Sequence, residues 1–432
     1  MIKKIKLAHK LEGIIKAPGD KSISHRAALL NSIANGVANI TNFCEGDDET
    51  AMIGCLKQLG ADISEIPNND KNSPAYKIRG NGLNGLSEPK DILYAGNSGT
   101  AMRLISGLLA GQDFYSVISG DNSLRSRPMK RITTPLTMMG ADIYGRNNAS
   151  YAPLTFNPKR LNSIEYDMPI ASAQLKSCLL IASLYASGET LLNQPEESRD
   201  HTEKMLSAMG APINKKDLAI KIKPGELSSI NVKIPSDTSG SAFWIVAACC
   251  HPNAQLKITN VGMNPTRIGV IEVLQSMGAN LKFENESIQG GEPVADIIAS
   301  TSQLEGVEIS GEIIPRVVDE LPILALAACF AKGTTTIKNA EELRVKESDR
   351  ISTTVDILSK LMANINETPD GMVIKGTGKL IGNEIESHGD HRIAMTGGIA
   401  GLLSQGETYI SNSDHAEVSY PRFWKTLDTI IS

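Results

Sequence analysis

The chain of 432 residues carries a formal net charge of −5, and hydrophobic residues make up 41% of it. This length exceeds one ordinary domain, so we expect two domains with sizeable cores. The chain has neither a surplus of basic residues nor a long apolar run, which argues against a nucleic-acid partner and against a membrane partner.

The chain begins with MIKKIKLAHKLEG, which lacks the apolar core of a secretory signal. The six cysteines form no CxxC pair, and most lie in apolar runs; they are Cys44, Cys55, Cys178, Cys249, Cys250 and Cys329. We expect reduced, structural thiols in a cytoplasmic protein. His and Cys never cluster at the spacing of metal ligands, so we expect no metal.

Six apolar segments recur along the chain, each followed by a turn and a short β-rich run. The first reads HRAALLNSIANGVANITN, and the turns lie near Gly36, Gly111, Gly188, Asn253, Gly333 and Gly406. Each segment is apolar on all sides, which predicts a buried helix rather than a surface helix.

A second helical pattern falls within five of these units and ends in QLGADI, MMGADI, AMGAPI, SMGANL or KLMANI. Gly near a helix end is typical of a left-handed C-cap. In the fifth copy Met362 takes the place of Gly, which predicts a different cap there.

The two patterns together predict an α/β fold in which a unit of helix, strand, helix and further strands recurs six times, and the six units divide into two similar domains of three units with buried helices. Pro18-Gly19 and the stretch KIPSDTSGS offer the residues of domain linkers. We therefore expect one domain at residues 20–236 and a second at 1–19 plus 237–432. The hinge is expected at about 16–20 and 233–240.

Polar and charged residues stand where these helices are expected to begin. The buried helices open with KSISHR (21–26), GNSGTAMR (96–103), SAQLKS (172–177), SDTSGS (236–241), DELP (319–322) and DHR (390–392). Several of these residues fit simple helix caps, including those of SDTSGS and the pair Asp319-Glu320. Asp47-Asp48, before a second helix, also resembles a cap.

Cationic residues in the same places are harder to explain as caps, because positive charge opposes the dipole of a helix N-terminus. They are Lys21, Arg26, Arg103, Arg127, Lys346, Arg350 and Arg392. Helix starts with added Lys and Arg bind phosphates and carboxylates well. The pattern predicts a ligand with several negative groups.

Eight motifs, in chain order, resemble the 5-enolpyruvylshikimate-3-phosphate synthase family over about residues 11–424. They are PGDKSISHR, GNSGTAMR, RPMKR, ASAQLKS, SRDHTEKM, DELP, LRVKESDR and DHRIAM. The resemblance implies the enolpyruvyl transferase fold, in which each of two similar domains has three βαβαββ units around buried parallel helices. This α/β fold is often described as an inside-out barrel. It also implies an addition-elimination reaction of phosphoenolpyruvate with shikimate 3-phosphate in the shikimate pathway, with no cofactor. We expect a monomer.

The same resemblance implies the site residues. Phosphoenolpyruvate would be bound by Lys21, Gly99, Arg127, Gln174, Arg350 and Arg392. Shikimate 3-phosphate would be bound by Lys21, Ser22, Arg26, Ser172, Ala173, Gln174, Arg199, Asp319 and Lys346. Asp319 is the expected base for the attacking hydroxyl. Lys21 and Glu347 are both candidate acids, and the sequence does not choose between them.

Two departures from one large branch of the family favour its bacterial second class. Leu104 stands where that branch has Pro, and Val418 stands where it has Lys. Gly99 keeps the small residue that the inhibitor glyphosate needs. One alternative is the UDP-N-acetylglucosamine enolpyruvyl transferase, which shares the fold but has a loop signature that is absent here. Another is a catalytically silent binding protein.

Overall fold

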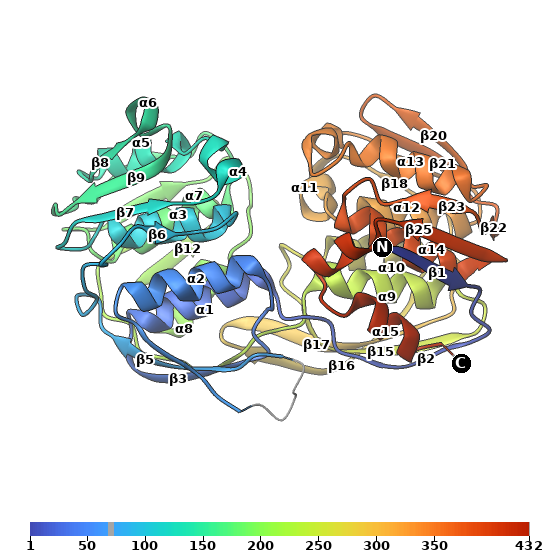
Figure 1. The fold of residues 1–432 in the computed structure, drawn as a ribbon, viewed down its shortest axis with the longest axis horizontal. Helices are drawn as coiled ribbons and strands as arrows, with labels where there is room; N and C mark the ends of the chain where they lie inside the picture. Colours follow the sequence, from blue (N-terminus) through green and yellow to red (C-terminus); the bar gives the residue numbers. More distant parts are fainter. Residues whose placement is uncertain (68–72, 432) are drawn as a thin grey trace. The chain divides into compact units, whose positions relative to one another are not determined.

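The computed structural model describes residues 1–67 and 73–431, which form two compact units (Figure 1). The internal unit comprises Gly19–Pro235 and Ile288–Glu292. The terminal unit comprises Met1–Pro18, Ser236–Ser287 and Pro293–Ser432, and it contains both chain ends. Each unit has a hydrophobic core of its own. Among the described residues, no helix has the length and apolar character needed to cross a membrane.

The internal unit contains helices α1 (Lys21–Ser32), α2 (Asp47–Gln58), α3 (Gly99–Leu109), α4 (Asn122–Ser126), α5 (Lys130–Met138), α6 (Arg146–Ala149), α7 (Ala173–Ser183) and α8 (His201–Ala208). Its strands are β3 (Asn35–Thr41), β4 (Asp62–Glu65), β5 (Tyr76–Asn81), β6 (Leu93–Tyr94), β7 (Ser116–Ser119), β8 (Asp142–Gly145), β9 (Tyr151–Asn157), β10 (Glu165–Asp167), β11 (Thr190–Asn193), β12 (Ile213–Lys216), β13 (Ala219–Ile222) and β14 (Val232–Lys233).

The terminal unit contains helices α9 (Thr238–Cys250), α10 (Gly269–Ser276), α11 (Ile314–Val317), α12 (Leu321–Phe330), α13 (Arg350–Lys360), α14 (His391–Leu403) and α15 (Phe423–Thr429), with short 3-10 helices η1 (Gly311–Ile313), η2 (Glu341–Val345) and η3 (Ser413–Val418). Its strands are β1 (Ile2–Lys6), β2 (Leu11–Ile15), β15 (Ala254–Gly262), β16 (Asn280–Gln289), β17 (Glu292–Ser300), β18 (Glu308–Ile309), β19 (Thr334–Ile337), β20 (Asn364–Thr368), β21 (Gly371–Lys375), β22 (Leu380–Ile381), β23 (Glu384–Glu386), β24 (Ser404–Gln405) and β25 (Glu407–Ser411).

One sheet pattern recurs six times in the described chain. The sheets of the internal unit run β14-β3-β5-β4, β6-β7-β9-β8 and β10-β11-β13-β12. Those of the terminal unit run β2-β15-β17-β16, β18-β19-β21-β20 and β23-β25-β1, beside the small β22-β24 pair. In each of the six, the first pair of strands is parallel and the second is antiparallel. The predicted α/β fold built from repeats is confirmed.

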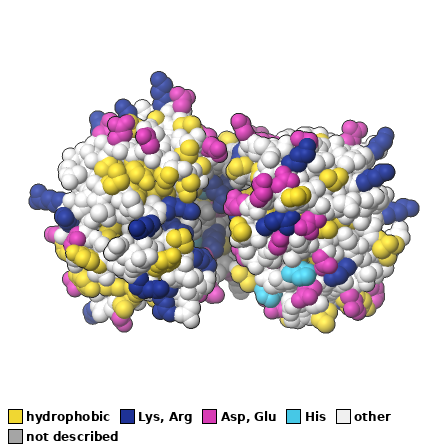
Figure 2. All heavy atoms as spheres, turned by 90° about the horizontal axis from the view of Figure 1, so that it is seen from above, with side chains coloured by type: hydrophobic (Ala, Val, Ile, Leu, Met, Phe, Trp, Pro, Cys, Tyr) yellow, Lys and Arg dark blue, Asp and Glu magenta, His cyan; other side chains and the backbone are white. Residues whose placement is uncertain are grey.

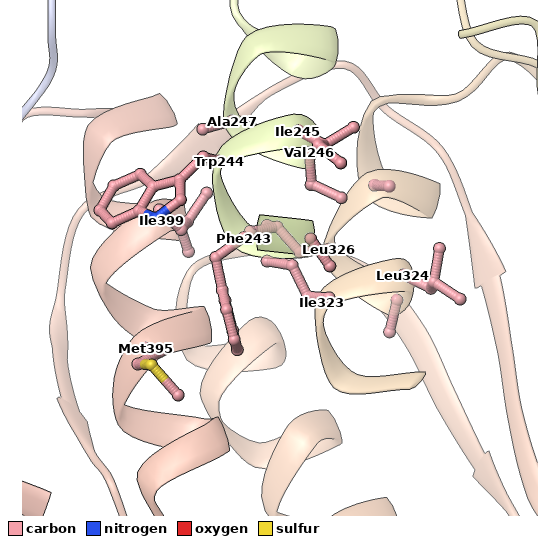
Figure 3. Close-up of a cluster of buried hydrophobic side chains, with 14 of the residues drawn as sticks. Phe243, Trp244, Ile245, Val246, Ala247, Ile323, Leu324, Leu326, Met395 and Ile399 are labelled. Atoms are coloured by element: carbon pink, nitrogen blue, oxygen red, sulfur yellow. The ribbon is translucent and has the colours of Figure 1, made fainter. Parts of the chain in front are cut away.

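The six apolar helices are buried, as their composition predicts. In the terminal unit, α9 is buried from Thr238 to Cys249, and α12 is buried from Leu321 to Cys329. Figure 3 shows the core where Phe243 and Trp244 of α9 lie among side chains of α12 and α14. In the internal unit, a Cβ on Gly107 would lie 2.3 Å from the carbonyl oxygen of Cys178, so α3 and α7 pack with their backbones close together.

The second helices share one C-cap, including the copy without Gly. Gly60, Gly140, Gly210 and Gly278 have φ between 86° and 97°, and Met362 has φ 67°. The amide of Met362 donates to Ser359 and that of Ala363 donates to Leu358, the pattern of the four Gly copies. The prediction of a different cap is therefore wrong: a non-Gly residue adopts the same left-handed conformation.

Met362→Gly is expected to stabilise the terminal unit by about 0.5–1 kcal/mol, because Gly adopts a positive φ without steric cost. Met362 is 65% exposed, so its removal sacrifices little buried apolar surface. Thermal unfolding followed by circular dichroism checks this. Met362→Ala is the control, since it trims the side chain but keeps the Cβ; an equal gain in both variants would contradict the backbone explanation.

Candidate active site

Lys21 is the first residue of α1, in the internal unit. Asp20 caps this helix by accepting from the amide of Ile23 at 2.8 Å. The Lys21 ammonium forms an ion pair with the carboxylate of Asp48 in the first turn of α2. Burial opposes its charged form, but Asp48 and Glu49 outweigh burial and raise the pKa of Lys21. Lys21 therefore keeps its proton at neutral pH.

The contact with Lys21 also corrects the sequence interpretation of Asp47-Asp48 as a helix cap. The cap position of α2 is Gly46, and no side chain forms a capping hydrogen bond there. Asp48 instead faces the ammonium group of α1.

Arg26 lies one turn along α1 and is buried. Its Nε donates to Thr202 Oγ1 at 2.6 Å, its Nη2 to Ser177 Oγ at 2.8 Å and its Nη1 to the carbonyl of Ser22 at 2.9 Å. Burial lowers the pKa of Arg26 to about 10, against the opposing charges of nearby carboxylates. Arg26 is still charged at neutral pH, and its guanidinium is fixed in one orientation.

Gly99 is the first residue of α3, which Ser98 caps. A Cβ on Gly99 would lie 2.8 Å from Arg103 Nη1 and 3.4 Å from Arg127 Nη1. Arg103 Nη1 also donates to Gln174 Oε1 at 2.5 Å, and Gln174 Nε2 donates to Thr100 Oγ1 at 3.0 Å. These contacts gather Gly99, Arg127 and Gln174 in one place and fix the orientation of the Gln174 amide.

Arg103 has no substrate role in the sequence prediction, yet it links α3 to α7. Burial lowers its pKa to about 10, and the nearby charges of Arg131 and Arg127 lower it as well. The sequence did mark Arg103 as a cationic residue in the first turn of α3, and this was the signal that could have identified it as part of the site.

The other predicted residues of the internal unit lie at or near helix ends, and Arg127 is the C-cap of α4. Arg127 Nη2 donates to Asn97 Oδ1 at 2.5 Å, just before α3. Ser172 caps α7 by accepting from the amide of Leu175, and Ala173 is the first residue of that helix. Arg199 precedes α8, and its charge acts on Arg26.

Arg350 is the centre of the predicted residues in the terminal unit. Its side chain is 2% exposed and binds three carboxylates. Its Nε donates to Asp390 Oδ2 at 2.8 Å, its Nη2 to Glu347 Oε2 at 2.6 Å and its Nη1 to Asp319 Oδ1 at 3.3 Å. Burial opposes the charged form, yet these three carboxylates raise the pKa of Arg350. One guanidinium therefore holds both candidate catalytic carboxylates.

Arg392 lies in the first turn of α14, which Asp390 caps by accepting from the amide of Arg392 at 2.8 Å. Its Nη1 lies 3.6 Å from Glu320 Oε1. Burial and the nearby charge of Arg392 together lower the pKa of His391 to about 3, so the imidazole is neutral. Asp390 was not predicted as a site residue. Its place as the cap residue before His391 was the signal that could have identified it.

The interpretation of Asp319-Glu320 as a simple cap is also wrong. No side chain forms a capping hydrogen bond at the start of α12. Glu320 accepts from the Ser239 hydroxyl and pairs with Arg392, whereas Asp319 pairs with Arg350. Lys346, before α13, donates to Glu342 Oε1 at 2.5 Å.

The predicted residues thus form two clusters, one in each unit, mostly at helix starts. In the space-filling view, Lys and Arg gather along one margin of the visible face of the internal unit, whereas the terminal unit mixes both charges (Figure 2). Within residues 1–67 and 73–431, no three His, Cys, Asp or Glu side chains are grouped in a way that could hold a metal ion. The described cysteines are all free thiols.

Comparisons with known proteins agree along almost the full chain. The family model of EPSP synthase (3-phosphoshikimate 1-carboxyvinyltransferase) matches residues 5–427. The 3-phosphoshikimate 1-carboxyvinyltransferase of Syntrophomonas wolfei is 47% identical over 424 residues, covering 98% of each chain. That of Thermoanaerobacter pseudethanolicus is 48% identical over 421 residues, covering 97% of this chain and 98% of the relative.

A solved structure of EPSP synthase from Acinetobacter baumannii extends the likeness to the fold. It superimposes with a TM-score of 0.94 at 41% identity, and the match covers 100% of this chain and 98% of that chain. Family model, relatives and solved structure agree with the motifs at the helix starts, and the chain belongs to the EPSP synthase family.

Proposed function

We propose that this protein transfers the enolpyruvyl group of phosphoenolpyruvate to the 5-hydroxyl of shikimate 3-phosphate and releases phosphate. This is the carboxyvinyl transfer of the shikimate pathway, which leads to the aromatic amino acids. The observation that supports it most is the Arg350 guanidinium, which holds Asp319 and Glu347 together beside the start of α13. The transfer needs a base and an acid, and Asp319 and Glu347 are candidates for these roles beside one anion-binding arginine.

Phosphoenolpyruvate carries a phosphate and a carboxylate, so its site needs several cations. We assign its binding to Lys21, Gly99, Arg127, Gln174, Arg350 and Arg392. Arg127 and Gln174 flank Gly99, whose missing side chain leaves the space beside two arginines open. Arg side chains bind such groups with two parallel hydrogen bonds.

Shikimate 3-phosphate carries a phosphate, a carboxylate and ring hydroxyls. We assign its binding to Lys21, Ser22, Arg26, Ser172, Ala173, Gln174, Arg199, Asp319 and Lys346. The starts of α1 and α7 supply free backbone N–H groups, and Arg26 adds a fixed positive charge between α1 and α7.

The reaction needs one base and one acid. Asp319 would take the proton of the 5-hydroxyl while the hydroxyl oxygen attacks C2 of phosphoenolpyruvate. In the same step the methylene carbon of phosphoenolpyruvate gains a proton from the acid. Lys21 and Glu347 are both candidate donors. The Lys21 ammonium pairs with Asp48, and Glu347 accepts a hydrogen bond from Arg350.

Collapse of the tetrahedral intermediate completes the reaction. Its C–O bond to phosphate breaks, and the methyl carbon returns its proton as the enol double bond forms again. Lys and Arg charges stabilise the departing phosphate. The finer assignment to the bacterial second class rests on Leu104 and Val418, and the small residue at Gly99 leaves room for glyphosate. We further propose a cytoplasmic monomer without nucleic-acid or membrane partners.

An assay of phosphate release with both substrates tests this function. We expect release that requires both phosphoenolpyruvate and shikimate 3-phosphate and that persists in EDTA. Turnover only with UDP-N-acetylglucosamine as acceptor would reassign the protein to the related enolpyruvyl transferase. Tight binding of both substrates without turnover would identify a silent binding protein, and loss of activity in EDTA would reveal a required metal.

We also propose that the two units are the two domains, one at about residues 20–236 and the other at 1–19 plus 237–432. The chain passes between the units at Pro18/Gly19 and Pro235/Ser236, which supports this division, and again at either end of the tip Ile288–Glu292.

A further inference from the structure

The first turn of α8 is fixed by three consecutive side chains, all of them buried. His201 Nδ1 lies 2.8 Å from Glu292 Oε1. Thr202 Oγ1 accepts from Arg26 Nε at 2.6 Å, and Glu203 Oε1 lies 2.7 Å from Lys176 Nζ. Successive residues of a helix point about 100° apart, because one turn takes 3.6 residues. The start of α8 is therefore held from three directions.

The three partners come from three different elements. Arg26 belongs to α1, Lys176 belongs to α7, and Glu292 is the first residue of β17. Glu292 lies in the tip Ile288–Glu292 of the β16–β17 hairpin, which belongs to the internal unit although the rest of the hairpin belongs to the terminal unit. The third contact is thus the only one of the three made by a segment outside residues 19–235.

The hairpin tip fits closely against α8. Gly291 has φ +86°, and a Cβ there would lie 2.6 Å from the carbonyl oxygen of Lys204. A Cβ on Gly290 would lie 3.0 Å from Val232 Cγ1. Gly291 therefore lets the tip backbone approach α8, and Gly290 lets it approach Val232 of β14, while the Glu292 carboxylate contacts His201.

The segment before α8 carries a proposed substrate residue, Arg199. Lys176 Nζ donates to the carbonyl of Ser198 at 3.1 Å, and Ser198 Oγ donates to Gln194 Oε1 at 2.8 Å. The same helix start orients Arg26 through Thr202. The position of the first turn of α8 therefore determines the positions of Arg26 and Arg199, which we both assign to shikimate 3-phosphate.

We infer that Glu292 is a positioning residue for shikimate 3-phosphate: through His201 it fixes the start of α8, and with it Arg26 and Arg199. The inference rests on the proposed function. An ionised carboxylate only accepts hydrogen bonds, so His201 Nδ1 carries the proton in this contact. Glu292 also contributes negative charge that favours the charged form of the buried Arg26.

The test measures the Kd for shikimate 3-phosphate by calorimetry without phosphoenolpyruvate, alongside KM and kcat. Glu292→Ala is expected to raise this Kd by about 10-fold, a loss equivalent to ~1.4 kcal/mol, and to leave the KM for phosphoenolpyruvate within about 2-fold. Glu292→Gln keeps an acceptor for Nδ1–H and should recover most of the affinity. The matched control is Glu286→Ala, an exposed residue of β16 in the same hairpin.

A double-mutant cycle distinguishes positioning from mere stability. His201→Ala should raise the Kd as much as Glu292→Ala does, and the double variant should be no worse than either single variant. Additive effects would overturn the inference. The inference would also be overturned if Glu292→Ala lowered the Tm but kept a Kd for shikimate 3-phosphate within 2-fold of that of Glu286→Ala.

Gly291→Ala gives a second route if Glu292→Ala does not fold. It displaces the tip without altering either partner, and it should also raise the Kd for shikimate 3-phosphate selectively; an unchanged Kd would contradict the inference. Wild-type protein that neither binds shikimate 3-phosphate nor releases phosphate would instead refute the proposed function. Wild-type activity with unaffected variants would refute only the role of Glu292.

Discussion

Asp319→Asn is expected to lower kcat by about 10²- to 10⁴-fold, the usual contribution of a positioned general base. The amide has the shape of the carboxylate and can still accept the hydrogen bond from Arg350 Nη1, so the site should keep its structure. It cannot accept the proton of the attacking hydroxyl. Steady-state kinetics with both substrates varied, together with calorimetry for shikimate 3-phosphate, checks the prediction.

The matched control is Asp428→Asn, which removes one carboxylate of α15 from an exposed pair with Lys3. Its kcat should stay within about 2-fold of wild type. If Asp319→Asn kept more than a tenth of the wild-type kcat, another group would have to be the base.

Arg350→Gln is expected to produce the largest combined loss of stability and activity. Asp390 is fully buried and forms a bidentate pair with Arg350, so the variant leaves a buried carboxylate without its cation. Breaking such a pair from one side costs about 3–5 kcal/mol. The variant also frees Asp319 and Glu347 from their common partner, so we expect a higher KM for phosphoenolpyruvate and a lower kcat.

The double variant Arg350→Gln/Asp390→Asn separates the two effects. Removing both charges leaves no buried carboxylate without its cation at position 390, so much of the lost stability should return while the activity stays low. Thermal unfolding and the phosphate-release assay measure the two quantities independently. If the double variant were no more stable than Arg350→Gln, the buried charge of Asp390 would not be the cause of the lost stability. Arg316→Gln, which breaks a partly exposed pair with Glu272, should cost less than about 1 kcal/mol.

The stability difference between wild type and Arg350→Gln should depend on pH. Burial alone would favour the neutral form of Asp390, but Arg350 lowers the pKa of this carboxyl below its usual value. A lowered folded-state pKa gives stability that is complete above the ordinary carboxyl pKa of about 4 and is lost as pH falls through the lowered pKa. The difference in Tm should therefore narrow below about pH 4.

Much of the fold could be predicted because it depends on local patterns. Helices that are apolar all round have to be buried, and Gly at a regular place marks the end of a helix. Met362 shows the limit of that inference: the helix-end hydrogen bonds persist without Gly because the surrounding unit imposes them. The type of residue shows only which backbone conformation is preferred at a position. At Met362 the fold of the repeated unit imposes the left-handed conformation without a Gly.

The partners of the charged residues were harder to predict. The sequence marked Lys21 and Arg350 as unusual at helix starts, but it did not identify Asp48 or Asp390 as their partners. His201 and Glu292 are 91 positions apart, and their contact depends on where a hairpin tip lies in three dimensions. No periodicity along a chain encodes a contact of that kind.

The pairing of β1 with β25 has a consequence for synthesis of the protein on the ribosome. Ile2 pairs with Ser411, so β1 waits for a partner that is made 409 positions later. At about 5–20 residues per second, that wait is roughly 20–80 s. Residues 19–235 emerge as one stretch and can fold in the meantime, whereas β1 remains an unpaired strand. During that time the unpaired edges of β1 are exposed to chaperones and to aggregation.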